Sequence, residues 1–157
     1  MKFSILSHAS LYIEDDEIRL ITDPWLSGSC YWRSWWNFPT VDEDIYSTID
    51  PTHIYISHLH WDHYHLPTLR RICRSCPTIL IPKSITPRMY NDLIELNCSI
   101  LELEHTKLYS LNNNFQIRSF QVNPFFLDSA LYIRCGSVSI LNLNDTKPSG
   151  LTAIYLR

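Results

Sequence analysis

Short apolar runs separated by prolines and polar turns predict a chain built mainly from β-strands. Two other segments, 66–76 and 84–97, are typical of helices because each has a proline in or near its first turn, and Ser84 is the expected cap of the second. Strands, then a β-α-β-α-β stretch, then strands again predict an α+β fold, a mixed sheet with helices on one side. The runs that we interpret as strands are residues 3–6, 11–14, 18–22, 53–57, 78–82, 99–104, 107–111, 115–122, 129–135 and 137–143.

The apolar runs at 53–57 and 78–82 are typical of strands that are buried on both faces. Residues 23–39 carry many aromatic side chains and no regular pattern, which predicts an irregular loop. The last two strands are expected to join at Gly136. No internal repeat, low-complexity tract or linker interrupts the 157 residues, so we expect a single domain over 1–157.

Charge and composition narrow the classes of function. With a net charge of −3 and a pI of about 6.1, the chain offers no basic face for nucleic acid or an anionic membrane. No run approaches the roughly 18 apolar residues of a membrane-spanning helix, and the N-terminus lacks the apolar core of a signal peptide. The five cysteines are scattered and odd in number, which is typical of reduced thiols in a cytoplasmic protein. Cys73 and Cys76 form a Cys-x-x-Cys pair without a second pair, so we expect them to pack a helix.

Histidines are concentrated in one place: residues 57–65, "SHLHWDHYH", hold four of the seven. His58 and His60 are two residues apart, so on an extended segment they point the same way, as half of a tetrahedral metal site. Asp62 and His63 follow on a turn, where they can face a second centre. Oxygen and nitrogen donors without thiolate suit zinc, iron(II) or manganese. The alternative is an exposed polar loop whose histidines cap the helix that starts near residue 66.

Two further histidines of this region have simpler interpretations. His53 is expected to be structural. His65 is also expected to be structural, either as the N-cap of the following helix or as a group that supports a metal ligand from behind.

The spacing His-x-His-x-Asp-His resembles the signature of the metallo-β-lactamase superfamily. Residues 7–28, "SHASLYIEDDEIRLITDPWLSG", are similar to the opening strands of that superfamily. The stretches "TDPWLSGSCYWRSWW" and "IYISHLHWDH" are especially similar to the metal domain of the CMP-N-acetylneuraminate hydroxylases and their bacterial relatives. "SILNLNDT" resembles the strand that ends in a metal-bridging aspartate, here Asp145. The resemblance covers residues 3–150.

The resemblance implies a metallo-β-lactamase-type αββα sandwich whose first half is complete and whose second half is abbreviated. It also implies that His58 and His60 hold a first ion, that Asp62 and His63 hold a second, and that Asp145 bridges them. In the family the residue at Asp62 also orients the attacking water, which makes it the expected catalytic residue. Asp23 is expected to fix the loop beside the site. His8 falls where relatives place a polar group, or it is a structural histidine.

Two departures from the family pattern favour one ion over a full pair. Asn123 stands where a third histidine for the first metal is expected, and no histidine follows His105. The chain ends at Arg157, before the region that normally supplies a last histidine for the second metal. An abbreviated second half would leave apolar sheet uncovered, so we expect self-association or a protein partner that covers it.

Four tryptophans, Trp25, Trp32, Trp35 and Trp36, gather around the aromatic loop. They are expected either to form a packed lid or to line a site for a small-molecule substrate, because aromatic faces bind sugars, nucleotides and lipids.

Three functions are compatible with these features. The first is a hydrolase in which metal-activated water attacks an ester, phosphodiester or amide, with zinc the first choice of ion, iron or manganese the alternatives, and one or two ions bound. The second is a component related to sialic-acid hydroxylation that needs a redox partner. The third is a shortened, non-catalytic homologue that acts as a binding module.

Overall fold

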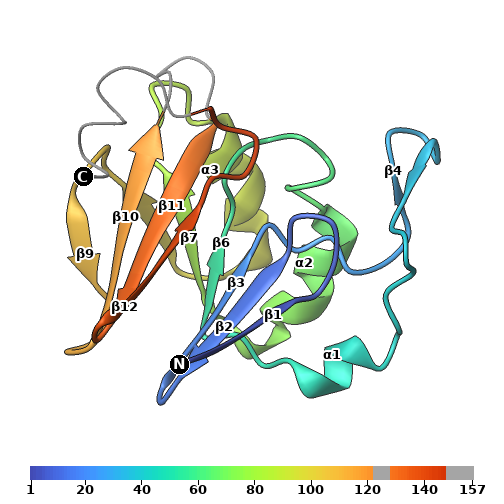
Figure 1. The fold of residues 1–157 in the computed structure, drawn as a ribbon. Helices are drawn as coiled ribbons and strands as arrows, with labels where there is room; N and C mark the ends of the chain where they lie inside the picture. Colours follow the sequence, from blue (N-terminus) through green and yellow to red (C-terminus); the bar gives the residue numbers. More distant parts are fainter. Residues whose placement is uncertain (122–127, 148–157) are drawn as a thin grey trace.

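Two β-sheets pack face to face in the computed structural model, which describes residues 1–121 and 128–147 (Figure 1). The larger sheet has the strand order β1-β2-β3-β6-β7-β8; β1, β2 and β3 are antiparallel, and the following strands pair in parallel. Its strands are β1 Lys2–Ile5, β2 Leu11–Asp15, β3 Ile18–Thr22, β6 His53–Tyr55, β7 Thr78–Pro82 and β8 Ile100–Leu103.

The smaller sheet is antiparallel in the order β12-β11-β10-β9. Its strands are β9 Leu108–Ser110, β10 Phe115–Gln121, β11 Ser129–Cys135 and β12 Val138–Asn142. The residue pattern predicted one mixed sheet, and the structure divides it in two, because these last strands bury one face against the larger sheet. The join at Gly136 is confirmed: its φ of +58° lies in the left-handed region that favours glycine.

Three helices occur among the described residues: α1 Ile45–Thr48, α2 Leu66–Ile72 and α3 Arg88–Leu93. A 3₁₀ turn continues α2 over Cys73–Ser75, and another continues α3 over Ile94–Leu96. Both predicted helices exist, but the second begins at Arg88. The reason is local: Pro87 disfavours helical geometry at Thr86, and the Ser84 hydroxyl accepts the Thr86 N–H at 3.0 Å instead of capping the helix.

Each predicted strand occurs within two residues of its expected ends. Three elements were not predicted: α1 and a small hairpin of β4 Ser29–Cys30 and β5 Trp35–Trp36 within the aromatic loop. Asn123 and the final run 151–157 lie outside the described residues. No helix in the described part of the chain is long and apolar enough to cross a membrane.

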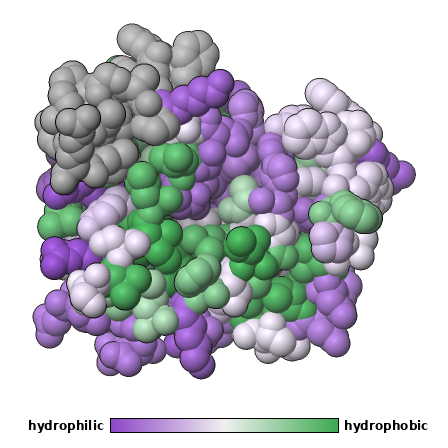
Figure 2. All heavy atoms as spheres, in the orientation of Figure 1, coloured by the Kyte–Doolittle hydropathy of each residue, from purple (hydrophilic) through white to green (hydrophobic). Residues whose placement is uncertain are grey.

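Two hydrophobic clusters hold the layers together, and strands β6 and β7 contribute to both. Ile54 and Ile79 face the helices, where they pack with Leu69. Tyr55 and Leu80 face the smaller sheet and pack with residues such as Phe115, Leu131 and Ile133. The prediction that these two strands are buried on both faces is confirmed. Figure 2 shows hydrophobic residues gathered across one face of the molecule. The edge strand β1 exposes Phe3 and Ile5, at 61% and 79% of their surface.

Helix α2 begins at a histidine cap. His65 Nδ1 accepts the backbone N–H of Thr68 at 3.3 Å, which confirms its expected role as N-cap. Burial lowers the pKa of His65 from 6.5 to about 4, so the ring is neutral and its nitrogen can accept at neutral pH.

This cap predicts an acid-sensitive fold. The folded pKa of His65 lies below its unfolded value, so the unfolded chain takes up the proton first. The free energy of unfolding should therefore fall by up to about 3 kcal/mol as the pH drops from 6.5 to 4, and this contribution should be constant outside that window. His65→Asn keeps a cap acceptor without a titrating group and should flatten that part of the profile. Urea unfolding at a series of pH values, with a chelator present, measures the free energy of unfolding. If this free energy falls by the same amount between pH 6.5 and 4 in the wild type and in His65→Asn, the prediction is wrong.

Candidate metal centre

The histidine motif occupies the loop that leaves β6 and leads into α2. β3 and β6 are parallel, so the segments that follow them emerge at the same edge of the sheet. Asp23 follows β3 directly, and its backbone N–H donates to the Tyr55 carbonyl at 2.8 Å. Asp145 comes from the smaller sheet, just beyond β12. Residues far apart in the sequence thus converge where three strands end.

One group of donors consists of His58, His60 and Asp145. His58 Nε2 lies 2.8 Å from His60 Nδ1 and 3.6 Å from Asp145 Oδ2. One ligand atom from each of the three residues falls within 4.8 Å of the others, a spacing that could hold a metal ion. His58 is buried, whereas the other two residues are exposed, so this group is open to solvent on one side.

A second group consists of Asp62, His63 and His8. His63 Nε2 lies 3.4 Å from Asp62 Oδ2, and His8 Nε2 lies 3.2 Å from the same oxygen. These three residues also satisfy the spacing for an ion. Asp145 Oδ2 is 3.5 Å from His63 Nε2 and 3.6 Å from His58 Nε2, which places one carboxylate oxygen between the two groups.

Behind both groups, the fully buried carboxylate of Asp23 fixes the imidazole rings. It accepts the backbone N–H and the hydroxyl of Ser57, both at 2.7 Å, and it lies 3.1 Å from His63 Nδ1. The Ser57 hydroxyl gives its proton to Asp23, so its oxygen accepts from His58 Nδ1 at 2.9 Å. Both rings therefore carry their proton on Nδ1 and direct the lone pair of Nε2 toward the centre.

The buried Nε2 atom of His63 is the feature of the centre that most directly points to a cation. The side chain of His63 is 1% exposed, and its Nε2 has no hydrogen-bond partner among residues 1–121 and 128–147. A buried nitrogen lone pair without a donor costs about 1–3 kcal/mol. A cation placed between this nitrogen and the neighbouring carboxylates would remove that cost.

Burial and neighbouring charges shift the pKa values of three residues in the centre. Burial alone would lower the pKa of His63, but the hydrogen bond to Asp23 and the charges of Asp23, Asp62 and Asp145 outweigh it and raise the pKa. Burial and the neighbouring His63 lower the pKa of His58. Burial would raise the pKa of Asp62, yet the hydrogen bond from the Tyr31 hydroxyl and the nearby His63 hold it below its usual range. Asp62 is thus ionised at neutral pH.

The spacing between the groups fits a small divalent ion. Ligand atoms bound at about 2.0–2.2 Å to a tetrahedral ion lie about 3.3–3.6 Å apart. The Asp62 and Asp145 oxygens lie 3.2 to 3.6 Å from the imidazole nitrogens, which is close to this separation of ligand atoms. Direct charge-assisted hydrogen bonds are shorter, about 2.7–2.9 Å. The pair His58–His60, at 2.8 Å, is instead at hydrogen-bond distance.

A family model described as "Beta-lactamase superfamily domain" matches residues 2–146 of this chain. The chain belongs to that family. The fold and the relatives expected from the motif are confirmed, although the described residues carry helices over the larger sheet only.

Curated relatives of this beta-lactamase superfamily domain include hydroxylases. The chain is 29% identical to the cytidine monophosphate-N-acetylneuraminic acid hydroxylase of Pongo pygmaeus, over 96% of this chain and 27% of that protein. It is 25% identical to a putative Rieske 2Fe-2S iron-sulfur protein of Mycolicibacterium smegmatis, over 99% of this chain and 32% of that protein. The chain therefore spans about a third or less of the length of these relatives.

Solved structures support the same fold. CmlA, a diiron β-hydroxylase from Streptomyces venezuelae, superposes with a TM-score of 0.73 at 22% identity, over 96% of this chain and 30% of that one. An isothiocyanate hydrolase from Delia radicum gut bacteria superposes with a TM-score of 0.75 at 12% identity, over 99% of this chain and 66% of that one.

Three contacts of this superfamily domain were not found from the sequence. His8 reaches Asp62, the Tyr31 hydroxyl donates to Asp62 Oδ1 at 2.7 Å, and Asp128 Oδ1 lies 3.9 Å from His58 Nε2. Only His8 carried a signal, its place near the pocket in relatives. No spacing rule connects the other two residues with the motif, because separate loops bring them there.

The tryptophans divide into two environments. Trp25 is 1% exposed and packs its ring edge-on to His8, with centroids 5.8 Å apart, so it is part of the core beneath the site. Trp32, Trp35 and Trp36 lie on the β4–β5 hairpin and are exposed; for Trp32 the exposed fraction is 87%. Trp61 from the motif joins them, with its ring 5.0 Å from that of Trp32.

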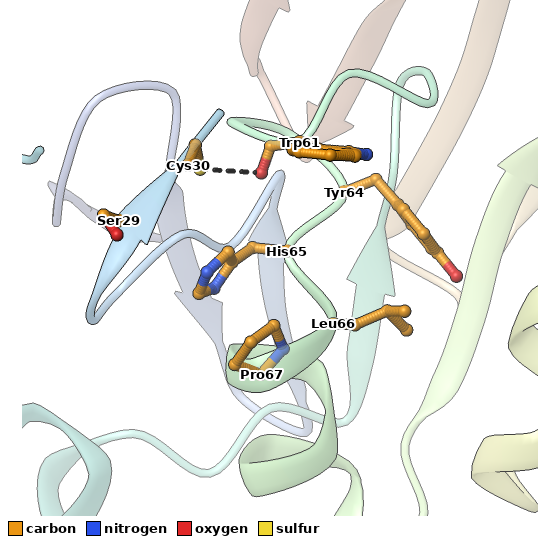
Figure 3. A pocket seen from close by; sticks show the side chains of 7 residues that line it. All are labelled: Ser29, Cys30, Trp61, Tyr64, His65, Leu66 and Pro67. Carbon is orange, nitrogen blue, oxygen red and sulfur yellow. Dashed lines mark hydrogen bonds between the residues drawn. The ribbon is translucent and has the colours of Figure 1, made fainter. Parts of the chain in front are cut away.

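A cavity of about 260 Å³ separates the hairpin from the motif loop (Figure 3). The Cys30 thiol donates to the Trp61 carbonyl at 3.0 Å across its upper side. Its lining is largely apolar and carries no charged side chain, since His65 is neutral at pH 7. The lining residues are Ser29, Cys30, Trp61, Tyr64, His65, Leu66 and Pro67.

Asp23 provides a test of ring orientation that leaves all candidate ligands in place. Asp23→Asn replaces one acceptor oxygen by an N–H₂ group, which cannot accept from Ser57 or His63. We expect Zn²⁺ affinity to fall about 10- to 100-fold, the usual effect of removing a carboxylate that orients a ligating histidine. Competition with a chromogenic chelator measures the affinity. Asp50→Asn, at an exposed ion pair with Arg19, is the matched control and should bind as the wild type; equal affinity of all three proteins would contradict the assignment.

Proposed function

We propose that this domain is a metal-dependent hydrolase that holds one or two divalent ions at His58, His60, Asp62, His63 and Asp145. The buried Nε2 of His63 is the observation that carries the proposal, because it lacks a hydrogen-bond partner in the described part of the chain and lies 3.4 and 3.5 Å from two carboxylate oxygens. Buried polar atoms are almost always satisfied, so an unpaired nitrogen facing two carboxylates points to a cation.

The roles of the residues follow from their partners. A bound divalent ion would acidify water and polarise the bond under attack in an ester, phosphodiester or amide. His58 and His63 present Nε2 lone pairs because Ser57 and Asp23 occupy their Nδ1 sides. Asp62, ionised and held through Oδ1 by Tyr31, keeps Oδ2 available to bind or to orient a water molecule. It is the proposed catalytic residue.

The surroundings suggest the class of substrate. The cavity beside the motif has a volume of about 260 Å³, slightly below the range of about 300–1,000 Å³ typical of ligand sites. A small uncharged ring or short aliphatic group of a small molecule fits this space and its apolar walls. The exposed Trp32, Trp35 and Trp36 do not line this cavity and are proposed to contact the substrate outside it. Trp25 is too buried to touch a substrate and is proposed to support His8 from below.

Oxidative hydroxylation is the second candidate. It is favoured by the relatives that match 96% of this chain, which are hydroxylases, and by a diiron hydroxylase of the same fold. Nitrogen and oxygen donors without thiolate suit iron(II) as well as zinc. This chemistry would need electrons from a redox partner. A non-catalytic binding module is the remaining alternative, and metal content decides it first.

The proposed setting is the cytoplasm, because all five cysteines are free thiols, the usual state in a reducing compartment. Among the described strands, β1 lies at one edge of the larger sheet and exposes Phe3 and Ile5; this edge is where a second copy or a protein partner would add to the sheet.

Metal content is the first test. Protein purified without a histidine tag or added metal should contain about one or two equivalents of zinc, iron or manganese by elemental mass spectrometry. His58→Ala should lose at least one equivalent, whereas His105→Ala, an exposed histidine outside the centre, should retain all of it. No bound metal, even after incubation with each ion, would leave the binding module as the function.

Activity separates the two enzymatic candidates. If the domain is a hydrolase, chromogenic esters or phosphodiesters should be cleaved, and Asp62→Asn should reduce the rate by at least about 100-fold, since several kcal/mol of transition-state stabilisation depend on the metal and its water. If it is a hydroxylase, those substrates should remain intact, and the iron-loaded protein should consume oxygen only when an electron donor is supplied.

A further inference from the structure

We infer that His8, a residue outside the motif, is a ligand of the second metal ion, so that the loop between β1 and β2 closes the metal centre. The inference rests on the proposed function and extends it, because it assigns the second ion a donor that the motif does not contain. With His8, each donor group has the same composition: His58, His60 and Asp145 form one, and His8, His63 and Asp62 form the other.

Two imidazoles and one carboxylate make a recurring set for a catalytic ion. Such sets hold zinc in hydrolases and iron(II) in oxygenases, in both cases with positions left open for water or substrate. Without His8, the second group would offer only one imidazole and one carboxylate besides the shared Asp145. Among the described residues, the second ion therefore gains its second imidazole from the loop between β1 and β2.

Distances around Asp62 support coordination over a simple ion pair. His8 Nε2 and His63 Nε2 stand at 3.2 and 3.4 Å from the same oxygen, Asp62 Oδ2. These distances are close to the separation of two ligand atoms bound to one tetrahedral, zinc-sized ion, and they are longer than a charge-assisted hydrogen bond. The unpaired Nε2 of His63, in a side chain that is 99% buried, faces the same space and independently points to an ion there.

The loop that carries His8 is firmly placed. On one side of His8, the Ser7 hydroxyl donates to the Trp25 carbonyl at 2.7 Å. On the other side, the Ser10 hydroxyl donates to the Asp23 carbonyl at 2.7 Å and accepts the Trp25 N–H at 3.1 Å. Both flanking serines thus bind the segment that supplies the buried Asp23 carboxylate. The same backbone segment therefore positions His63 from behind and His8 from the opposite side.

The ring of His8 is held in the direction that ligation needs. It packs edge-on against Trp25, Trp35 and His63, with ring centroids 5.8, 6.3 and 6.1 Å away. Its side chain is still 45% exposed, so burial alone does not require its contact with Asp62.

Two variants separate a ligand from a hydrogen-bond donor. His8→Ala removes both functions, whereas His8→Gln retains an N–H₂ group that can donate to Asp62 but offers a poor ligand for zinc. Equilibrium dialysis with Zn²⁺ should give two equivalents for the wild type and for His105→Gln, and one equivalent for both His8 variants. Circular dichroism checks that each variant is folded.

Hydrogen exchange gives a readout that is independent of activity. Saturation with Zn²⁺ should slow exchange at the backbone amides of residues 6–10 at least about 10-fold in the wild type, and should leave these amides unchanged in His8→Gln. If the wild type binds two ions and both His8 variants also bind two, the assignment of His8 is wrong while the proposed function stands. The same conclusion follows if wild type and variants all bind one. If the wild type binds none, the proposed function itself fails.

Discussion

The carboxylate of Asp23 is the group on which the site depends. It is fully buried, which is costly for a charge unless hydrogen bonds replace the lost water. Ser57 supplies two of these bonds, and His63 supplies the third from Nδ1. One anion thus ties the end of β3 to the end of β6 and sets the proton positions of two imidazole rings. The orientation of the candidate ligands is therefore a property of the sheet and not of the motif loop alone.

The sheet architecture makes that anchor possible. Because β3 and β6 run in parallel, their ends meet at one edge, and because β6 is buried on both faces, the segment after it begins in a rigid, dry environment. The smaller sheet packs against the other side through Tyr55 and Leu80 and places Asp145 at the same edge. Two helices of modest length cover the larger sheet. The fold thus brings candidate donors from the loop after β6, from beyond β12 and from the β1–β2 loop to a common point.

The pKa values of the two buried histidines in the centre shift in opposite directions. The hydrogen bond to Asp23 and the charges of Asp23, Asp62 and Asp145 outweigh the effect of burial and raise the pKa of His63. A few ångströms away the pKa of His58 is lowered by burial and by His63 itself. An excess of carboxylates around buried imidazoles is the arrangement that a divalent ion neutralises.

The sequence by itself determined the secondary-structure elements and pointed to most of the candidate ligands. Alternating and continuous apolar runs identified the strands, because burial on one or both faces produces a characteristic order of apolar and polar residues, and the His-x-His-x-Asp-His spacing identified most of the candidate donors. Only the tertiary structure decided the rest. The last four strands form their own sheet, Trp25 is core while Trp32 is exposed, and His8, Tyr31 and Asp128 reach the centre from three separate loops. Contacts between distant loops leave no periodic trace in a sequence, since they depend on where the strand ends meet in space.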